Sequence, residues 1–300
     1  MTGHISISGV DIDADHLLRL REIVSRTKSR RNVLGGFSGN IAGAKRGRGS
    51  IFYDVRPWTE GDDIRHIDCY KTARTGVPHI RTAHEDRENK ALIIADFRPS
   101  MYFGTRRALR SVAAAETLSL SGWRAIAGQG HVGLAVATSR GVSFLGWAHD
   151  GHKFAGLLAK LTVIHGEEKD QHGNDEPEMS RVMEMAQSIS GAPTIMIVSA
   201  LDRPGENFDM VAALMAKRRS LVFLLISDIF ERAPPPGNYP YYTHDGQTGE
   251  IHISRRLAEK PIDNWPERLS RIGAKSLNIP AELPPSEIAR VLERFHDGSR

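Results

Sequence analysis

The sequence ALIIADFRPSM, residues 91–101, holds the clearest indication of the fold. Its first part, ALIIADF (91–97), is short and almost continuously apolar. Such a run is typical of a strand in a parallel sheet whose two faces are both covered by helices. Two runs of the same kind follow at TIMIVSA (194–200) and LVFLLIS (221–227). We therefore predict that all three segments are buried strands of a parallel sheet.

The segments around these strands alternate between helical and strand-like patterns. HVGLAVAT (131–138) and VSFLGWA (142–148) flank the turn SRG, so we expect a hairpin that supplies one antiparallel edge strand. Helices are expected at 105–127, at 151–164, from Pro177 onward, at 205–219, near 264–272 and at 286–296, and Asp150 is expected to be the N-cap of the second. A polar loop is expected at 165–176 and a second hairpin at 241–254. Strands that alternate with helices predict an α/β fold with a doubly wound, mostly parallel sheet.

The N-terminal part of the chain has a different character. Residues 11–30 carry an apolar stripe at helical spacing, whereas residues 31–60 are too rich in glycine to form one regular element. Within this part, SIFYDVRPW (50–58) has the composition of a strand. We therefore predict three regions: an N-terminal helix in residues 1–30, a small irregular or β-rich region in residues 31–88, and an α/β domain in residues 89–300.

Composition excludes several classes of protein. Of the 300 residues, 40% are hydrophobic and 25% are charged, as in globular proteins, and no apolar run is long enough to cross a membrane. The N-terminus lacks the pattern of a secretory signal, and Cys69 is the only cysteine, so we expect a cytoplasmic protein with neither an internal disulfide nor a cysteine-based zinc site. The net charge is +4, and basic residues cluster in RTKSRR (26–31) and AKRGRG (44–49). Because no aromatic residues interleave with them, we expect solvated runs rather than a nucleic-acid site.

Polar side chains follow the predicted strands at their carboxyl ends, where open α/β sheets place their sites. At or just after the ends of the first two strands the sequence has Asp96, Arg98, Ser100, Ser199 and Asp202, and at the end of the third it has Ser227, Asp228 and Glu231. We expect the residues after the first two strands to form a partner-binding face at this edge of the sheet.

The loop after the first strand resembles a metal-binding motif. Asp-x-Ser-x-Ser at this place binds Mg²⁺ in von Willebrand factor A domains, and the predicted arrangement of strands resembles theirs. Here Arg98 replaces the middle serine, and a guanidinium is a permanent cation that accepts no hydrogen bond and repels a metal ion. We therefore expect no cofactor, with Asp96 capping the turn and bonding Ser100 and Arg98. The alternative is Mg²⁺ held by Asp96, Ser100 and Asp202.

A longer segment carries a resemblance to a family. YDVRPWTEGDDIRHIDCYKTARTGVPHIRTAHEDRENKALIIADFRPSM (53–101) resembles the domain-of-unknown-function-58 (DUF58) family, and the likeness continues to about residue 255. The residues that match the family pattern are Arg56, Gly61, Asp62, Asp63, Arg65, Ile67, Asp68, Ala73 and Arg74. The resemblance implies a von Willebrand A-like domain with a small β-rich portion, and a role beside a MoxR-type AAA+ ATPase. This sequence departs from the family at Cys69, where tryptophan is usual, at Arg98, and at Ala200, where an aspartate is often found.

The stretch EGDDIRHID (60–68) is dense in charged residues. We interpret it as part of a structural ion-pair network whose members are Arg56, Asp62, Asp63, Arg65, Asp68 and Arg74. A solvated surface cluster is the plainer alternative. An acid–base centre of Asp63, His66 and Asp68 is a third interpretation, but no motif for a nucleophile accompanies it.

Other reactive side chains give weaker signals. Cys69 lies beside Asp68, which disfavours its thiolate, so we expect it to pack in a core rather than act as a nucleophile. His149 and His152 lack a third ligand and are interpreted as surface residues.

The sequence thus favours a non-enzymatic adapter that works with a MoxR-type AAA+ ATPase in the assembly, metal insertion or maturation of a client complex. Neither nucleic acid nor membrane insertion is expected. The first alternative is a Mg²⁺-dependent protein-binding module, and the second is a metal-dependent hydrolase.

Overall fold

The computed structural model describes residues 9–26, 53–59, 62–83, 90–169, 176–189, 191–242, 248–254 and 264–298. The chain divides into two compact units. The small unit comprises residues 40–87, and the large unit comprises residues 1–39 together with 88–300. In the sequence, the small unit is therefore inserted between the N-terminal segment and the first strand of the large unit.

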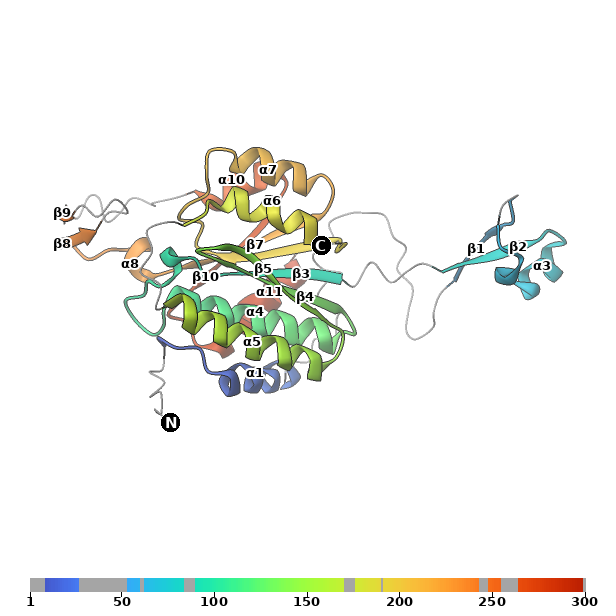
Figure 1. The fold of residues 1–300 in the computed structure, drawn as a ribbon, viewed down its shortest axis with the longest axis horizontal. Helices are drawn as coiled ribbons and strands as arrows, with labels where there is room; N and C mark the ends of the chain where they lie inside the picture. The colour runs from blue at the N-terminus through green and yellow to red at the C-terminus, as the bar shows by residue number, and fades with distance from the viewer. Residues whose placement is uncertain are drawn as a thin grey trace. The chain divides into compact units, whose positions relative to one another are not determined.

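The large unit is built on a six-stranded sheet in the order β10-β7-β6-β3-β4-β5 (Figure 1). The strands are β3 (Lys90–Asp96), β4 (His131–Thr138), β5 (Gly141–Ala148), β6 (Thr194–Ser199), β7 (Ser220–Ser227) and β10 (Lys275–Pro280). Neighbouring strands are parallel except β4 and β5, which form a hairpin. The predicted mostly parallel sheet with one antiparallel edge strand is confirmed.

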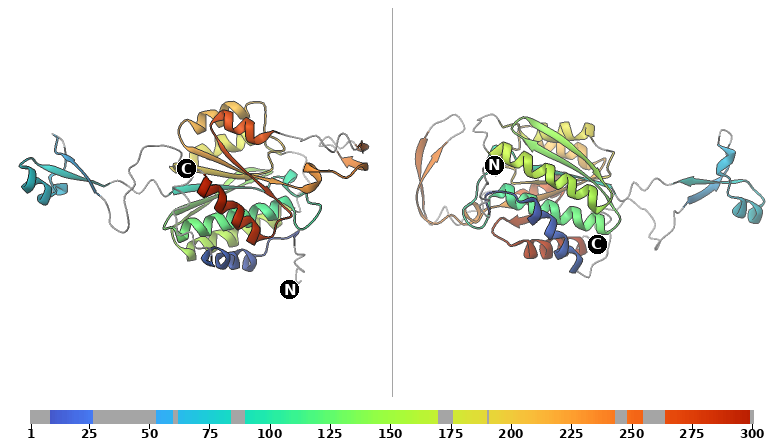
Figure 2. Two further views of the ribbon diagram at one scale, coloured as in Figure 1. Left: turned by 180° about the vertical axis from the view of Figure 1, so that it is seen from behind. Right: turned by 60° about the horizontal axis from the view of Figure 1, so that its bottom comes forward.

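Helices cover both faces of this sheet, as a doubly wound fold requires (Figure 2). One face is covered by α1 (Ala14–Arg26), α4 (Arg110–Ala127), α5 (Gly151–Lys169) and α11 (Pro285–Gly298), and the other by α6 (Met179–Ile189), α7 (Phe208–Ala216) and α10 (Trp265–Ile272). Each face has its own core of buried apolar side chains, and β3 contributes Ile93 to the first core and Leu92 and Ile94 to the second. Burial on both faces explains why the sequence of this strand is continuously apolar.

The register of the sheet brings the carboxyl ends of its strands to one edge. Ala95 of β3 lies opposite Val198 of β6, and Ser199 of β6 lies opposite Leu225 of β7. The last residues of β3 and β6 therefore lie side by side. Two short helices follow strands at this edge, namely η3 (Pro99–Met101) after β3 and α8 (Ile229–Arg232) after β7, and the hairpin of β8 (Gly237–Tyr242) and β9 (Thr248–Ile253) comes next in the chain.

The small unit is built on an antiparallel pair of short strands. These are β1 (Tyr53–Pro57) and β2 (His79–Ala83), with η1 (Ile64–His66) and α3 (Cys69–Thr75) between them in the sequence. Gly76 ends α3 with φ +72°, a left-handed conformation that glycine adopts without strain. Among the described residues of this unit, Ile80 is the one apolar side chain that is fully buried. The unit therefore has little apolar core of its own.

The sequence placed most elements correctly but misjudged several boundaries. The helix expected at 105–127 begins at Arg110, the helix expected at Pro177 begins at Met179, and α5 continues through Lys169 into the expected polar loop. The helix expected at 205–219 is shorter, at Phe208–Ala216. Strands β2 and β10 and helices α3 and α8 were not predicted.

The N-terminal helix is an integral part of the large unit. Leu17 and Leu20 of α1 are buried in the core beside α4 and α5, and the indole nitrogen of Trp123 donates to the carbonyl of Leu17 at 3.0 Å. Asp150 accepts from the backbone N–H of Lys153 at 2.8 Å, so the predicted cap of α5 is confirmed. Within the described ranges, no helix combines the length and the apolar character needed to cross a membrane.

Candidate functional site

A cluster of buried charged side chains lies where β3 and β6 end. We call this region the strand-end face and define it by Asp96, Arg98, Ser100, Ser199 and Asp202. Asp96 is the last residue of β3, and Arg98 follows two residues later, before η3. The side chains of Arg98 and Asp96 are 0% and 1% exposed, respectively. The sheet therefore ends in an ion pair that is removed from water.

The guanidinium of Arg98 binds Asp96 in a bidentate fork. Its Nε lies 2.9 Å from Oδ1 of Asp96, and its Nη2 lies 2.8 Å from Oδ2. The backbone N–H of Arg98 also donates to Oδ1 of Asp96, at 3.1 Å. Two parallel charge-assisted bonds fix both the position and the plane of the guanidinium.

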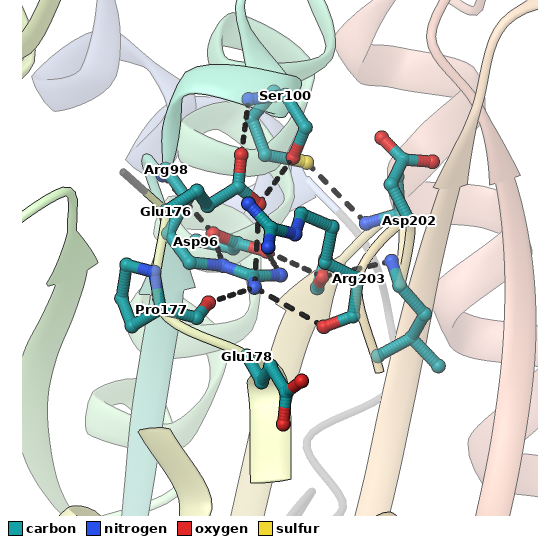
Figure 3. Close-up of polar contacts among 12 residues, drawn as sticks. Asp96, Arg98, Ser100, Glu176, Pro177, Glu178, Asp202 and Arg203 are labelled. Carbon is teal, nitrogen blue, oxygen red and sulfur yellow. Dashed lines mark hydrogen bonds and ion pairs between the residues drawn. The ribbon is translucent and has the colours of Figure 1, made fainter. Parts of the chain in front are cut away.

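The remaining nitrogen of this guanidinium reaches across the strand end (Figure 3). Nη1 of Arg98 donates to the carbonyl oxygens of Pro177 and Arg203, at 2.6 Å and 3.4 Å, and lies 3.3 Å from Oε1 of Glu176. Burial disfavours the charged form of Arg98, but the carboxylates of Asp96 and Glu176 outweigh burial and hold its pKa above the ordinary value. The guanidinium thus ties the segment before α6 and the segment after β6 to the end of β3.

The two serines of the strand-end face bind different carboxylates. Ser199 donates from Oγ to Oδ2 of Asp96 at 2.5 Å. Ser100 binds Glu176 instead, with its N–H at 2.9 Å and its Oγ at 2.8 Å from that carboxylate. The expectation that Asp96 bonds Arg98 is confirmed, and the expectation that it also bonds Ser100 is wrong because Glu176 takes that serine.

Ser199 also supports an unusual backbone conformation. Leu201 has a φ of +59°, in the left-handed region that costs a non-glycine residue about 1–2 kcal/mol. Its N–H donates to Oγ of Ser199 at 3.0 Å, and its side chain is buried. This turn directs the chain from the end of β6 to Asp202.

Asp202 belongs to a second ion-pair cluster rather than to the Asp96 pair. Arg110 binds it with Nη1 at 3.2 Å and Nη2 at 2.5 Å, and Arg110 also binds Glu231 and the carbonyl of Ser100. The side chain of Arg110 is 4% exposed, whereas those of Asp202 and Glu231 are 33% and 31% exposed. This cluster therefore presents its carboxylates outward and keeps its cation inside.

The pKa of Glu231 depends on burial and on several neighbouring charges. Burial raises its pKa, Asp202 and Asp228 add to that effect, and Arg110 opposes it. The neighbouring Asp228 caps α8 by accepting from the N–H of Phe230 at 2.8 Å, and it also accepts from the N–H of Thr105 at 2.9 Å. Burial opposes the ionised form of Asp228, but a hydrogen bond from the hydroxyl of Thr105, these two backbone hydrogen bonds and the charge of Arg110 hold its pKa below the ordinary value.

The residues of the strand-end face do not fit a divalent metal. Both carboxylate oxygens of Asp96 accept from Arg98, and Asp202 is paired with Arg110. The Oγ of Ser100 is turned to Glu176. The guanidinium of Arg98 lies between Asp96 and Glu176, where it supplies the positive charge that a metal ion would supply.

Of the predicted network of the small unit, the described residues form one close pair, one looser pair and two helix caps, the looser pair being Nε of Arg65 and Oδ1 of Asp63 at 3.8 Å. Arg56 binds Asp62 at 2.8 Å and 2.6 Å, with the two side chains 44% and 16% exposed. The hydrogen bonds from Arg56 and from Thr59 hold the pKa of Asp62 well below its usual range. This pair closes the loop that follows β1.

The other carboxylates and arginines of this network have local roles. Asp63 accepts from the N–H of Arg65 at 3.0 Å, and Asp68 accepts from the N–H of Lys71 at 2.8 Å, so each caps the helix that follows it. Arg65 and Arg74 are exposed. Gly61 and the side chain of His66 lie outside the described residues.

Cys69, His149 and His152 are all at the surface. Cys69 is exposed, so the expectation that it packs in a core is wrong. His149 lies 3.2 Å from Asp150. In the part of the chain that the structure describes, no three histidine, cysteine, aspartate or glutamate residues are grouped to hold a metal ion.

Two residues that organise the strand-end face were missed by the sequence analysis. Glu176 lies in the expected polar loop, and Arg110 lies inside an expected helix, where arginine is an ordinary surface residue. No sequence pattern distinguishes either position. The position of Arg98 after a buried strand was the one signal available.

Comparison with known proteins gives the family of the chain. The family model described as "Protein of unknown function DUF58" matches residues 54–258. A segment of 98 residues is 36% identical to the uncharacterized proteins Mb1516 of Mycobacterium bovis and Rv1480 of Mycobacterium tuberculosis. The matched segment covers 32% of this chain and 30% of the length of these relatives.

Solved structures with some similarity include the conserved hypothetical protein BatB from Bacteroides thetaiotaomicron, with a TM-score of 0.44, 9% identity, and coverage of 70% of this chain and 99% of that chain. An uncharacterized membrane spanning protein from Vibrio fischeri has a TM-score of 0.22 and 12% identity, with coverage of 68% of this chain and 98% of that chain. The family model matches well over half of the chain, and the chain therefore belongs to the DUF58 family.

Proposed function

We propose that this chain is a non-enzymatic adapter that works with a MoxR-type AAA+ ATPase in the assembly, metal insertion or maturation of a client complex. Membership of the DUF58 family and the resemblance of residues 53–101 support the choice of partner. We propose that a partner is recognised at this edge of the sheet, where open α/β sheets bind. Of the strand-end face, Asp202 is partly exposed, whereas Asp96, Arg98 and Ser199 are buried and support the edge from inside.

The observation that carries this proposal is the buried Asp96–Arg98 pair. In a metal-dependent binding module, a bound cation at this place accepts a carboxylate of the partner. Here a fixed guanidinium neutralises Asp96 and is itself buried beneath Pro177 and Arg203. Binding through this face therefore depends on side chains that the chain itself supplies, and we propose that it needs no metal.

The carboxylates at the strand ends support a role in binding rather than in catalysis. Asp96, Glu176 and Asp202 each accept hydrogen bonds from an arginine or a serine. General acid–base work needs a carboxylate that is free to exchange a proton with a substrate. Carboxylates held by permanent cations are suited to fixing shape and charge instead.

A binding experiment tests this proposal. The purified chain is mixed with the purified MoxR-type ATPase of the same organism, without nucleotide, with ADP and with a non-hydrolysable ATP analogue. We expect a complex whose stability depends on the nucleotide and which weakens at least about ten-fold in Asp202→Asn. The matched control is Glu184→Gln on the exposed face of α6, which is expected to bind as the parent does. The absence of a complex in every nucleotide state would contradict the proposal.

Two alternatives make different predictions. A Mg²⁺-dependent protein-binding module would bind the metal through Asp96, Ser100 and Asp202. A metal-dependent hydrolase would lose turnover in Asp63→Asn or Asp68→Asn while keeping its fold. We expect instead that these two changes lower helix stability only slightly, because asparagine caps a helix about as well as aspartate and only the negative charge at the helix N-terminus is lost.

A further inference from the structure

A cavity opens beside the strand-end face, at the carboxyl ends of β6, β7 and β10. Its volume is about 330 Å³, enough for one long side chain. Its walls come from the ends of the three strands, from α8 and from the start of α10. Asp202, Glu231, Ser227, Asn278 and Trp265 are the lining residues that bear on its chemistry.

Negative charge exceeds positive charge at one wall of this cavity. Asp202 and Glu231 are both paired with Arg110, which is 4% exposed, and Asp202 also interacts at longer range with the buried Arg98. A third carboxylate, Asp228, lies next to Glu231; it accepts hydrogen bonds from Thr105 and the backbone, and its charge also interacts with Arg110. Burial raises the pKa of Glu231, and Asp202 and Asp228 add to this effect while Arg110 opposes it. A second cation in front of these carboxylates would relieve the excess.

The other walls offer hydrogen-bond acceptors and apolar surface. Oγ of Ser227 is buried and has no hydrogen-bond partner. Asn278 adds an amide group to the lining, while Trp265 and Pro266 add apolar surface. An extended basic side chain has the matching features, with an apolar stem and a charged end that donates several hydrogen bonds.

Two features of the cavity favour an anion instead. Arg232 is a lining residue, and α10 begins at the wall with its free N–H groups. Arg232 is already bound to Glu282, and Glu267 in the first turn of α10 compensates the helix end. Neither feature leaves a positive charge without a partner, so the two partly exposed carboxylates dominate.

We propose that this cavity receives a basic side chain of a partner protein, which is held by the carboxylates of Asp202 and Glu231. The choice of a protein as the source of this side chain rests on the proposed adapter function. A metal-dependent module of this fold class would bind an acidic side chain of its partner. In this chain Arg98 replaces a metal ligand, and the cavity beside it is expected to bind a basic side chain instead.

The experiment uses small probes on the whole chain. N-acetyl-arginine methylamide is titrated up to about 50 mM, because ligands of this size bind weakly, and the indole N–H signal of Trp265 is followed by NMR. The citrulline derivative is the neutral probe of the same shape, and inorganic phosphate is the anionic probe. We expect the arginine probe to bind at least about ten-fold more tightly than the citrulline probe, because only the former carries a charge.

Substitutions at Asn278 sharpen the test without altering the ion-pair cluster. Asn278→Asp is expected to tighten binding of the arginine probe, and Asn278→Lys to weaken it several-fold, while Glu184→Gln is the control outside the cavity. Equal binding of the arginine and citrulline probes, binding of phosphate at Trp265, no binding of any probe, or indifference to Asn278→Lys would each overturn the inference. A chain that binds the arginine probe but no ATPase would refute the adapter function alone.

Discussion

The two units of the molecule each contain a bidentate pair of one arginine and one aspartate. In the large unit Arg98 binds Asp96 at 2.9 Å and 2.8 Å, and in the small unit Arg56 binds Asp62 at 2.8 Å and 2.6 Å. The geometry is almost the same, but the surroundings differ. Arg98 is 0% exposed and Arg56 is 44% exposed.

This difference shows that burial, rather than geometry, decides what such a pair does. Water competes for both members of the exposed pair, so that pair only shapes a loop. The buried pair has no water to replace a lost member, so it is an obligatory part of the strand end. The same chemistry thus gives a loop clamp in one unit and a fixed internal cation in the other.

The largest loss of stability is expected when the buried cation is removed. Arg98→Ala leaves Asp96 and Glu176 buried without their common partner, and we expect it to cost ~3–5 kcal/mol of unfolding free energy. Urea unfolding followed by circular dichroism measures this loss. Arg98→Lys keeps the charge but not the fork, so it is expected to recover part of the loss. A cost below about 1 kcal/mol, the value of an exposed pair, would contradict the assignment of Arg98 as an internal cation.

The second largest effect is a loss of stability of the large unit in acid, which we do not expect from the ion pair of the small unit. Burial lowers the pKa of His165 to about 4 from an ordinary 6.5, while Asp11 opposes this shift and Lys169 adds to it. Between these two pH values the unfolded chain binds a proton at this position and the folded chain does not, so stability falls as pH falls from 6.5 to about 4. The loss amounts to about 3 kcal/mol at most.

Urea unfolding of the large unit at a series of pH values measures this loss, with His165→Gln as the variant that lacks the titrating ring. The side chain of Ser111 binds Nε2 of His165 at 2.9 Å, and the amide of glutamine is able to replace that bond. The acid-dependent part of the loss between pH 6.5 and 4 is expected to shrink in the variant. The same pH dependence in parent and variant would show that another group is responsible. In the small unit Asp62 is expected to stay ionised throughout this range, because Arg56 and Thr59 lower its pKa.

The smallest change in stability is expected at the exposed pair. Arg56→Ala removes the hydrogen bonds to Asp62 and Thr59, so the loop after β1 is expected to loosen while the unfolding of the large unit is unchanged. Backbone NMR shifts limited to residues 53–62 would support this, with Arg65→Ala as an exposed control in the same unit. Destabilisation of the large unit as great as that in Arg98→Ala would remove the contrast between the two pairs.

The parts of the fold that were predictable from the sequence are those with a strong local pattern. The continuously apolar segments gave β3, β6 and β7, and the turn SRG gave the hairpin of β4 and β5. β10 has the sequence KSLNIP, in which polar residues interrupt the apolar ones because it is an edge strand with partly exposed side chains. An edge strand with one protected face lacks the uninterrupted apolar pattern of the central strands.

The candidate site was predictable only where sequence neighbours meet. Asp96 and Arg98 lie two residues apart, so their pairing followed from the motif. Glu176 and Arg110 reach the site through the fold, and so does the pairing of Asp202 with Arg110, which lies 92 residues away in the chain. Burial also could not be read from the motif, so the sequence alone could not tell the Arg98 pair from the Arg56 pair.

The central claim is that a guanidinium takes the place of a divalent cation at the end of β3. Calorimetric titration of the purified chain with Mg²⁺ and with Mn²⁺ at millimolar concentrations tests it most directly. The account predicts no saturable heat from either metal, in the parent and in Asp96→Asn alike. Saturable binding in the parent that disappears in Asp96→Asn would contradict it, because Asp96 would then bind a metal ion in preference to Arg98.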